Sequence, residues 1–255
     1  MIKNTFCFLD GIGTQKEQQL WLMGIHDWDS FVKTRRIPGI SAEKKLIHDL
    51  HIRKAAKAVL NDTFSYFSHL PKAETWRLFP YIQQSLYIDV EADARGNITC
   101  ITIYDGQDIQ TFIQGHTLDN KQVQNILDKY FLIITFNGGS YDIPLLKKRG
   151  IHINALHWDL RHSCARLGYT GGLKAIEKRH GIHRSRLVEE LRGGDPLKLW
   201  KTYRATADPH YLELLAEYNQ EDTINLETIA WKIYRKMHEE QLKFFKEHHI
   251  TVQHG

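Results

Sequence analysis

Residues 83–106 read QQSLYIDVEADARGNITCITIYDG, and the apolar run in this stretch leads directly into two carboxylates, Asp89 and Glu91. A buried strand would normally continue there with apolar side chains. Because successive side chains of a strand point to opposite faces, Asp89 and Glu91 project to the same side and repel each other unless a positive charge lies between them. The stretch therefore predicts a strand whose carboxylates hold a divalent cation.

The segments around this strand predict a sheet covered by helices. Three short β-branched segments separated by turn residues favour an antiparallel meander. They span residues 86–92, 97–106 and 108–115. A helical segment at 117–131 follows, then an apolar strand at 132–136, and the chain beyond Asp159 is mostly helical. This order of elements predicts an α/β or α+β architecture with a mixed sheet.

The N-terminal third of the chain predicts a small, mostly helical region. We expect a boundary near residue 82, with the helical region at 1–81 and the sheet-containing domain at 82–255. Ser41 is a candidate N-cap for a helix whose apolar residues have helical spacing. These residues are Leu46, Leu50, Ile52, Ala56 and Leu60.

Gly11-Ile12-Gly13 lies just ahead of a helical stretch in this region. It is similar to the turn of helix-hairpin-helix modules, in which backbone N–H groups hold a DNA phosphate. Gly11 and Gly13 are therefore candidate DNA-binding residues. The alternative is that the region forms only a small helical core, because Trp21, Trp28 and Phe31 are spaced as core residues are.

Composition excludes several classes of protein. The chain has 255 residues, 42% of them apolar, which is enough for one large domain or for a domain with a small appendage. Its three cysteines, Cys7, Cys100 and Cys164, are far apart, so neither a disulfide framework nor a cysteine zinc site is expected. No segment predicts a signal peptide or a membrane span, so we expect a cytoplasmic protein with reduced thiols and no membrane contact.

Positive charge is concentrated in one part of the chain. The formal net charge is only +4, but residues 147–192 contain eleven Lys or Arg and four Asp or Glu. This asymmetry predicts a surface that faces a polyanion, although a charge run is most often a solvated helix face. The candidate phosphate-neutralising residues are Lys147, Lys148, Arg161, Arg166, Lys174, Arg184 and Arg186.

Further acids occur in similar settings later in the chain. Asp142 follows the apolar strand at 132–136 and begins a helix, so its carboxylate is expected at a sheet edge. Tyr218 and Asp222 are four residues apart and therefore share one helix face. Oxygen ligands without nearby histidine or cysteine favour Mg²⁺ or Mn²⁺ over zinc. Two such ions about 4 Å apart can stabilise both oxygens of a phosphodiester displacement, which predicts phosphoryl-transfer chemistry.

Three stretches, by their order and spacing, resemble the exonuclease motifs of the DEDD superfamily, and the last has the form of the DEDDy subgroup. They are Asp89-x-Glu91, Asn137-Gly-Gly-Ser-Tyr141-Asp142 and Tyr218-x-x-x-Asp222. The phrases at 157–182 and 187–203 are similar to the YprB-like predicted 3′–5′ exonucleases. The resemblance covers about residues 82 to 235 and implies a ribonuclease-H-like fold, a mixed five-stranded sheet flanked by helices.

The resemblance also implies roles for individual residues. The metal ligands would be Asp89, Glu91, Asp142 and Asp222. Tyr218 would complete the catalytic set by orienting the attacking water, because a phenol with a reference pKa near 10 is a poor base at neutral pH. The candidate nucleic-acid-binding residues of this domain are Asn137, Tyr141, Lys174, Arg184 and Arg186.

Two residues near these motifs have alternative interpretations. Asn137 could form a turn instead of contacting the substrate. Asp159 could cap the helix that follows it or take part in catalysis.

Together with the acids, the resemblance implies a 3′–5′ exonuclease that uses two Mg²⁺ or Mn²⁺ ions on single-stranded or frayed ends. DNA is preferred over RNA as the substrate, with a helicase or a DNA repair protein as a partner. One alternative is a structure-specific endonuclease of the same fold. The other is a non-catalytic nucleic-acid-binding or scaffold module, against which the complete set of four acids argues, since such a module gains nothing from clustered negative charge near phosphates.

Overall fold

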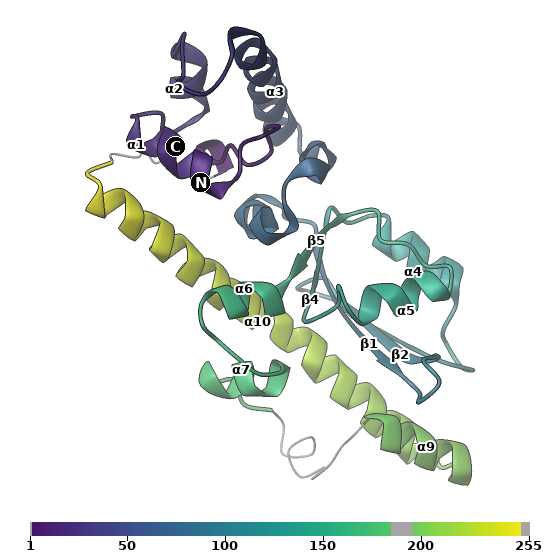
Figure 1. Cartoon of the computed structure of the whole chain (residues 1–255). Coiled ribbons are helices and arrows are strands. Elements are labelled where there is room, and N and C mark those ends of the chain that lie inside the picture. The colour runs from purple at the N-terminus through teal and green to yellow at the C-terminus, as the bar shows by residue number, and fades with distance from the viewer. Residues whose placement is uncertain (1, 185–195, 251–255) are drawn as a thin grey trace. The chain divides into compact units, whose positions relative to one another are not determined.

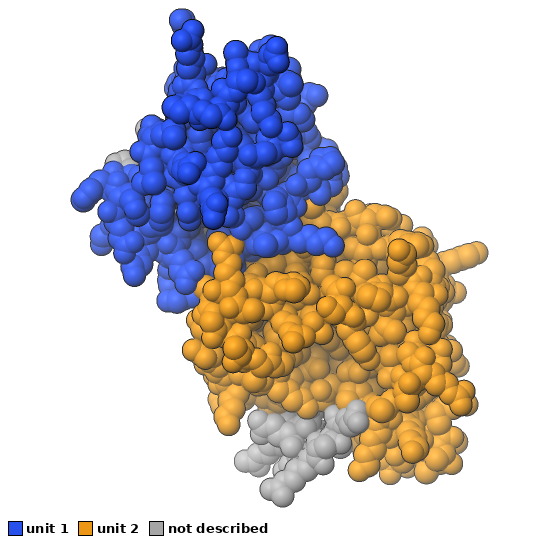
Figure 2. Space-filling view, viewed as in Figure 1, with its two compact units in different colours: residues 1–83, 234–255 blue, residues 84–233 orange. Residues whose placement is uncertain are grey.

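The computed structural model describes residues 2–184 and 196–250 (Figure 1). The chain divides into two compact units, one formed by Met1–Gln83 with Tyr234–Gly255 and the other by Gln84–Ile233 (Figure 2). The C-terminal residues join the first unit through aromatic packing. The ring of Tyr234 lies 6.2 Å from that of Trp76, and the ring of Phe245 lies 4.8 Å from that of Trp21.

The second unit is built on one mixed sheet of five strands in the order β3-β2-β1-β4-β5, as expected from the sequence. β1, β2 and β3 form the antiparallel meander, whereas β4 runs parallel to β1 and to β5. The strands are β1 (Ser85–Ala92), β2 (Ile98–Tyr104), β3 (Ile109–Ile113), β4 (Leu132–Thr135) and β5 (Leu156–Asp159). β1 is therefore a central strand, with a register shift against β2 between Glu91 and Ala92.

Helices cover both faces of the sheet (Figure 1). They are α4 (Asn120–Leu127), α5 (Asp142–Lys148), α6 (Leu160–Arg166), α7 (Leu173–Arg179), α9 (Pro196–Thr206) and α10 (His210–Glu247), the last of which continues into the first unit. No helix within residues 2–184 and 196–250 is long and apolar enough to cross a membrane.

Alternation along β1 separates the apolar core from the acids. Leu86, Ile88 and Val90 point into a core shared with α4 and α5. The side chains between them, including Asp89 and Glu91, project to the opposite face, as the period of two requires. That face is packed by α9 and α10, whose apolar residues form a second cluster with Cys100 of β2.

The first unit is mostly helical, as expected. Its elements are η1 (Ile2–Asn4), α1 (Thr14–Leu22), α2 (Trp28–Lys33), α3 (Ala42–Leu60), η2 (Phe64–His69) and η3 (Lys72–Tyr81). A buried cation organises the interior, because Arg77 lies 2.8 Å from a carboxylate oxygen of Glu17 and 2.6 Å from one of Glu74. Glu17 also accepts hydrogen bonds from the Thr5 hydroxyl and the Phe6 backbone N–H, so this network ties α1 to η3 and to the N-terminal segment.

The helix that begins after Ser41 is present, but several of its apolar residues with helical spacing lie outside its buried face. Ser41 accepts a hydrogen bond from the Lys44 backbone N–H and so caps α3. Three of the apolar residues that show helical spacing are nevertheless exposed: Leu46 by 64%, Leu50 by 54% and Leu60 by 83%. Buried polar residues take their place, because Lys45 is paired with Asp49 and the His48 ring contacts the Asp10 carbonyl oxygen.

The loop between β4 and α5 is held in an unusual backbone conformation. Asn137 has φ +67°, and the carboxylate of Asp159 accepts hydrogen bonds from the Asn137 and Gly139 backbone N–H groups at 2.8 and 3.0 Å. The Gly138 N–H donates to the Thr135 hydroxyl at 3.1 Å. A Cβ atom on Gly138 would lie only 2.2 Å from that hydroxyl oxygen, so this position requires glycine.

We therefore expect Gly138→Ala to lower the free energy of unfolding by roughly 1–3 kcal/mol, the range for overpacked sites. Urea denaturation followed by tryptophan fluorescence measures the change. Gly172→Ala is the matched control, because a Cβ atom there meets nothing within 4 Å and its φ is an ordinary −83°. Equal denaturation midpoints for the two variants would contradict the close packing of this loop.

Removal of the buried cation of the first unit should have a larger effect. Arg77→Gln leaves Glu17 and Glu74 buried without their counter-charge, which typically costs about 3–5 kcal/mol. Arg53→Gln, at an exposed position of α3, serves as the control. Thermal denaturation should show a much lower midpoint for the Arg77 variant, and a loss no greater than that of the control would argue against the network.

Candidate metal centre

Three carboxylates meet where β1 faces α10. Each of Asp89, Glu91 and Asp222 has a carboxylate oxygen that lies within 4.8 Å of those of the other two. β1 supplies Asp89 and Glu91 because they alternate with its apolar residues, and α10 supplies Asp222. Asp89 and Glu91 are partly exposed, whereas Asp222 is buried. The group therefore combines acids that the sequence separates by more than 130 positions.

Asp142 borders this group, but its carboxylate accepts a hydrogen bond from the backbone. β4 pairs with β1 only as far as Tyr87, and beyond that point the Val90 N–H donates to Asp142 Oδ1 at 2.8 Å. The carboxylate at the start of α5 thus continues the ladder where β4 turns away. Asp142 lies outside the three-residue group, yet its charge is felt by Asp89.

Burial raises the pKa values of Asp89, Asp142 and Asp222, and repulsion by the neighbouring acids adds to the shift at Asp89. The pKa of Asp89 is raised by burial and by the charges of Asp222, Asp142 and Glu91. Burial raises the pKa of Asp142 to about 7, although hydrogen bonds from backbone N–H groups act against this. Burial likewise raises the pKa of Asp222 to about 6, with Arg184 opposing the shift. The cluster resists full ionisation in the absence of added positive charge.

Tyr218 lies one helical turn before Asp222 and is buried. Two cations flank its ring: Lys174 Nζ lies 4.9 Å from the ring centroid and Arg184 Cζ lies 5.5 Å from it. Burial and the charge of Asp222 raise the pKa of the Tyr218 hydroxyl. The phenol therefore remains protonated at neutral pH and can act as a hydrogen-bonding group.

Three polar residues, of which Asn219 and Glu177 are buried, support the site and were not singled out from the sequence. The Asn219 amide donates to Asp89 Oδ2 and so orients that carboxylate. Glu177 of α7 accepts from the Asn225 amide at 2.9 Å and from Arg184. On α10, Asn225 follows Asp222 by three residues and therefore lies on the same helix face. This recurrence of polar residues along one face was the signal in the sequence that could have identified Asn225.

Arg184 enters the acidic cluster itself. Its side chain is 8% exposed, and its Nη2 atom lies 2.7 Å from Glu177 Oε2 and 2.5 Å from Asp222 Oδ1. The cation that the sequence placed among nucleic-acid-binding candidates is therefore paired with a member of the acidic group. Arg186 lies outside the described residues.

The remaining candidates of this unit lie around the site. Tyr141 is 44% exposed, and its pKa is raised by burial and by the charges of Glu91 and Asp142. Asn137 accepts a hydrogen bond from Arg161 Nη1 at 2.7 Å, and both residues line a pocket of about 500 Å³ that also contains Tyr169.

Asp159 caps the N-terminus of α6, which is one of its two predicted roles. Its carboxylate accepts a hydrogen bond from the Arg161 backbone N–H at the start of α6. The same carboxylate holds the backbone of the β4–α5 loop. Asp159 is therefore a structural residue that fixes the segment leading to Asp142.

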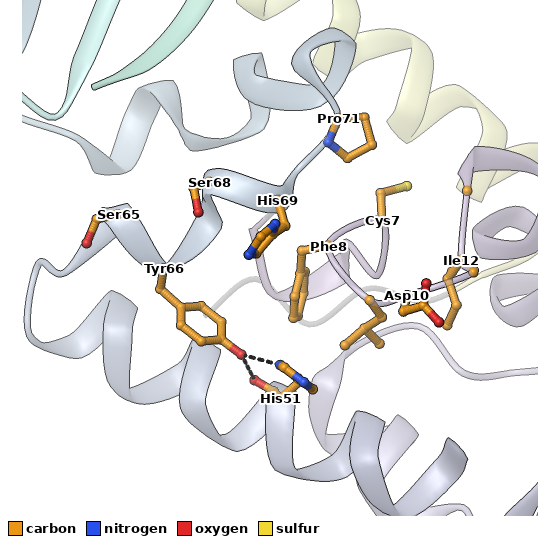
Figure 3. Close-up of a pocket in the computed structure, with 13 residues that line it drawn as sticks. Cys7, Phe8, Asp10, Ile12, His51, Ser65, Tyr66, Ser68, His69 and Pro71 are labelled. Atoms are coloured by element: carbon orange, nitrogen blue, oxygen red, sulfur yellow. Dashed lines mark hydrogen bonds between the residues drawn. The ribbon is translucent and has the colours of Figure 1, made fainter. Parts of the chain in front are cut away.

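Gly11 and Gly13 belong to the other unit, where they line a pocket of about 720 Å³ (Figure 3). Gly11 has φ +69°, and turns rather than an α-helix precede it in the described residues. Phe8, Tyr66 and His51 also line this pocket, and the Tyr66 hydroxyl donates to the His51 carbonyl oxygen.

The residues at the cluster fit a hard divalent cation. The three grouped ligands are all carboxylates, the donor class that Mg²⁺ and Mn²⁺ prefer. The raised pKa values of Asp89 and Asp222 indicate that the protein alone does not neutralise the negative charge. Asp89, Glu91 and Asp222 could hold such an ion directly, with Asp142 beside them.

A sequence model for the RNase_H superfamily, RNase_H_2, matches residues 86–234. The match covers more than half of the chain and includes β1, α5, α7 and the part of α10 that carries Tyr218 and Asp222. No curated protein matches the sequence.

The raised pKa values predict how stability depends on pH. The folded protein retains protons on Asp142 and Asp222 that the unfolded chain, with an ordinary value of 3.8, releases. This contribution to stability is complete below pH 3.8 and is lost as pH rises through about 6 to 7. In EDTA, the thermal midpoint should therefore fall by several degrees between pH 5 and pH 8.

Mg²⁺ or Mn²⁺ should reverse this loss, with a larger rise of the midpoint at pH 8 than at pH 5, because the ion binds ionised carboxylates. Asp142→Asn is the comparison that isolates one acid from the histidines that titrate in the same range. The pH dependence of this variant in EDTA should be flatter than that of the wild type. A thermal midpoint that rises from pH 5 to pH 8 and is unchanged by Mg²⁺ and by Mn²⁺ would contradict the assignment of these acids as a metal site.

Proposed function

Because the chain belongs to the RNase_H superfamily, we propose that it is a metal-dependent nuclease, and more narrowly a 3′–5′ exonuclease of the DEDDy type that resembles the YprB-like enzymes. The observation that carries the proposal is the meeting of Asp89, Glu91 and Asp222 at one point of the sheet. A fold of this superfamily with intact acids in that place supports phosphodiester hydrolysis more than binding alone.

Each residue has a distinct part in the proposed reaction. Asp89, Glu91, Asp142 and Asp222 would hold two Mg²⁺ or Mn²⁺ ions, which when bound supply Lewis acidity to the phosphate and to the attacking water. The Tyr218 hydroxyl stays protonated and orients that water through a hydrogen bond. Asn219 keeps the Asp89 carboxylate in place. Lys174, beside the Tyr218 ring, adds positive charge where the phosphate enters.

We propose that the substrate is single-stranded DNA and that the enzyme shortens it from its 3′ end. Support comes from the resemblance of the three motifs to exonucleases of the DEDDy subgroup and from the basic composition of residues 147–192. Asn137 and Tyr141 belong to the loop that leads into Asp142 and are proposed contacts of the strand. Gly11 and Gly13 are proposed as a DNA contact of the other unit, and a helicase or repair protein as the partner.

A structure-specific endonuclease is the second candidate, because the same acids would cut an internal bond equally well. End-labelled linear DNA and circular single-stranded DNA separate the two activities. Shortening of the linear strand from its 3′ end, with the circle left intact, supports the exonuclease. Cleavage of the circle supports the endonuclease.

The proposal predicts the effect of removing one acid. Asp89→Asn and Asp222→Asn should each reduce cleavage of single-stranded DNA by at least about 1,000-fold, as expected when members of one catalytic unit are removed. The fold should be retained, because each change relieves repulsion between buried carboxylates. Gel analysis of 3′- and 5′-labelled DNA and RNA with Mg²⁺, Mn²⁺ or EDTA measures the activity.

Glu213→Gln provides the control, since Glu213 is an exposed acid of the same helix α10. Its activity should equal that of the wild type. Cleavage by the Asp89 variant at the wild-type rate would refute the site. Tight binding by the wild type without cleavage under either metal would instead favour the scaffold function.

A further inference from the structure

The guanidinium of Arg184 is buried and has more donors than its protein partners use. Nε donates to Glu177 Oε2 at 2.8 Å, while Nη2 is shared between Glu177 Oε2 and Asp222 Oδ1. Nη1 is also buried, and it has no hydrogen-bond partner in the described part of the chain. Arg184 therefore offers an unused, charged donor inside the acidic site.

A buried donor of this kind costs free energy unless an acceptor reaches it, so it marks a place where a ligand completes the hydrogen bonds. The cation lies against the Tyr218 ring, beside the residues that we propose as catalytic. The acceptor that fits a guanidinium edge is a flat or tetrahedral oxyanion, and phosphate is the oxyanion of the proposed substrate.

We propose that Arg184 binds a non-bridging oxygen of the phosphodiester held at the acidic cluster, and that Glu177 is the positioning residue for this contact. The inference rests on the proposed function, because it takes the substrate to be a nucleic acid. It adds to that function the protein group that recognises the phosphate at the reacting position.

Glu177 is suited to positioning Arg184 and not to binding a metal ion directly. Its side chain is 3% exposed, and its Oε1 atom accepts from the Asn225 amide while Oε2 accepts from Arg184. It is absent from the group of acids that could hold a metal ion among the described residues. Two hydrogen bonds therefore fix the carboxylate, and the carboxylate in turn fixes the Nε side of the guanidinium.

Arginine is required at this position by geometry as well as charge. A guanidinium can face Glu177 with one edge, Asp222 with Nη2 and a phosphate with Nη1 at the same time. A lysine ammonium has its three donors on a single atom and cannot span these partners. The contact reads a phosphate and neither base nor sugar, so it should not discriminate between sequences or between DNA and RNA.

Charge-matched variants and a neutral phosphate analogue test the proposal together. Arg184→Lys keeps one positive charge beside Asp222 and Glu177, and Glu177→Gln removes the positioning charge. Arg204→Gln is the control, because Arg204 is an exposed cation of α9 in the same unit. Thermal denaturation and Mn²⁺ titration of each variant report on the fold and on the metal site separately from activity.

The binding probe is a fluorescein-labelled single-stranded oligonucleotide whose 3′-terminal linkage is either a phosphodiester or an uncharged methylphosphonate. Fluorescence anisotropy in EDTA at low salt and pH 5, where Asp142 and Asp222 retain their protons, measures its affinity. The wild type should bind the phosphodiester about tenfold more tightly than the analogue. Arg184→Lys and Glu177→Gln should bind the two probes equally, whereas Arg204→Gln should keep the wild-type difference.

Activity provides the second measurement. With Mn²⁺, kcat/KM of Arg184→Lys on the phosphodiester should fall about 100-fold, as for loss of one donor to a reacting oxyanion, with unchanged Mn²⁺ affinity. An unchanged kcat/KM would overturn the inference, as would a preference for the phosphodiester that survives in Arg184→Lys. If the wild type never cleaves but shows the Arg184-dependent preference, the nuclease function fails and the phosphate site stands.

Discussion

Partly buried negative charge on the central strand is the constraint on which this site depends. β1 must pack apolar side chains against α4 and α5, and its period of two then sends Asp89 and Glu91 to the face that α10 covers. Asp222 arrives there from the helix and adds a third charge within 4.8 Å. Carboxylates in such a place are unstable unless they are protonated, hydrogen-bonded or paired with a cation, and the protein uses each of these means.

The supporting residues divide this task among themselves. Asp142 accepts the Val90 N–H and thereby also completes the backbone hydrogen bonds of β1 beyond the end of β4. Asn219 donates to Asp89, and Arg184 pairs with Asp222. Asp159 acts one step further away, because it fixes the loop through which the chain passes from β4 to Asp142. The geometry of the acids thus depends on contacts made by α6, α7 and α10 as much as on β1.

Local spacing predicted the parts of this arrangement that depend on local geometry. Alternation placed Asp89 and Glu91 on one side of a strand, and the four-residue separation placed Tyr218 and Asp222 on one helix face. The β-branched segments and their turns likewise predicted the meander, and the sheet that followed from them is present.

Contacts between residues far apart in the sequence could not be predicted from local spacing. Arg184 and Asp222 meet across 38 positions, and nothing in the run of basic residues distinguished Arg184 as a cation that turns inward. The first unit shows the same limit. Apolar spacing predicted the helix α3 but does not identify its buried side, because Lys45 and His48 find polar partners inside while Leu46 and Leu50 remain exposed.

The charges around the site support the proposal that two divalent ions and one phosphodiester bind there together. Five acids contribute when Glu177 is included, and Arg184 and Lys174 are the cations near Tyr218 and Asp222. Full ionisation of these groups leaves three negative charges, and the pKa values of Asp89, Asp142 and Asp222 are raised accordingly. Two divalent ions would displace any bound protons and leave one positive charge. A single phosphodiester brings the charge that balances it, so the fully assembled site, and neither the metals nor the strand alone, would reach neutrality.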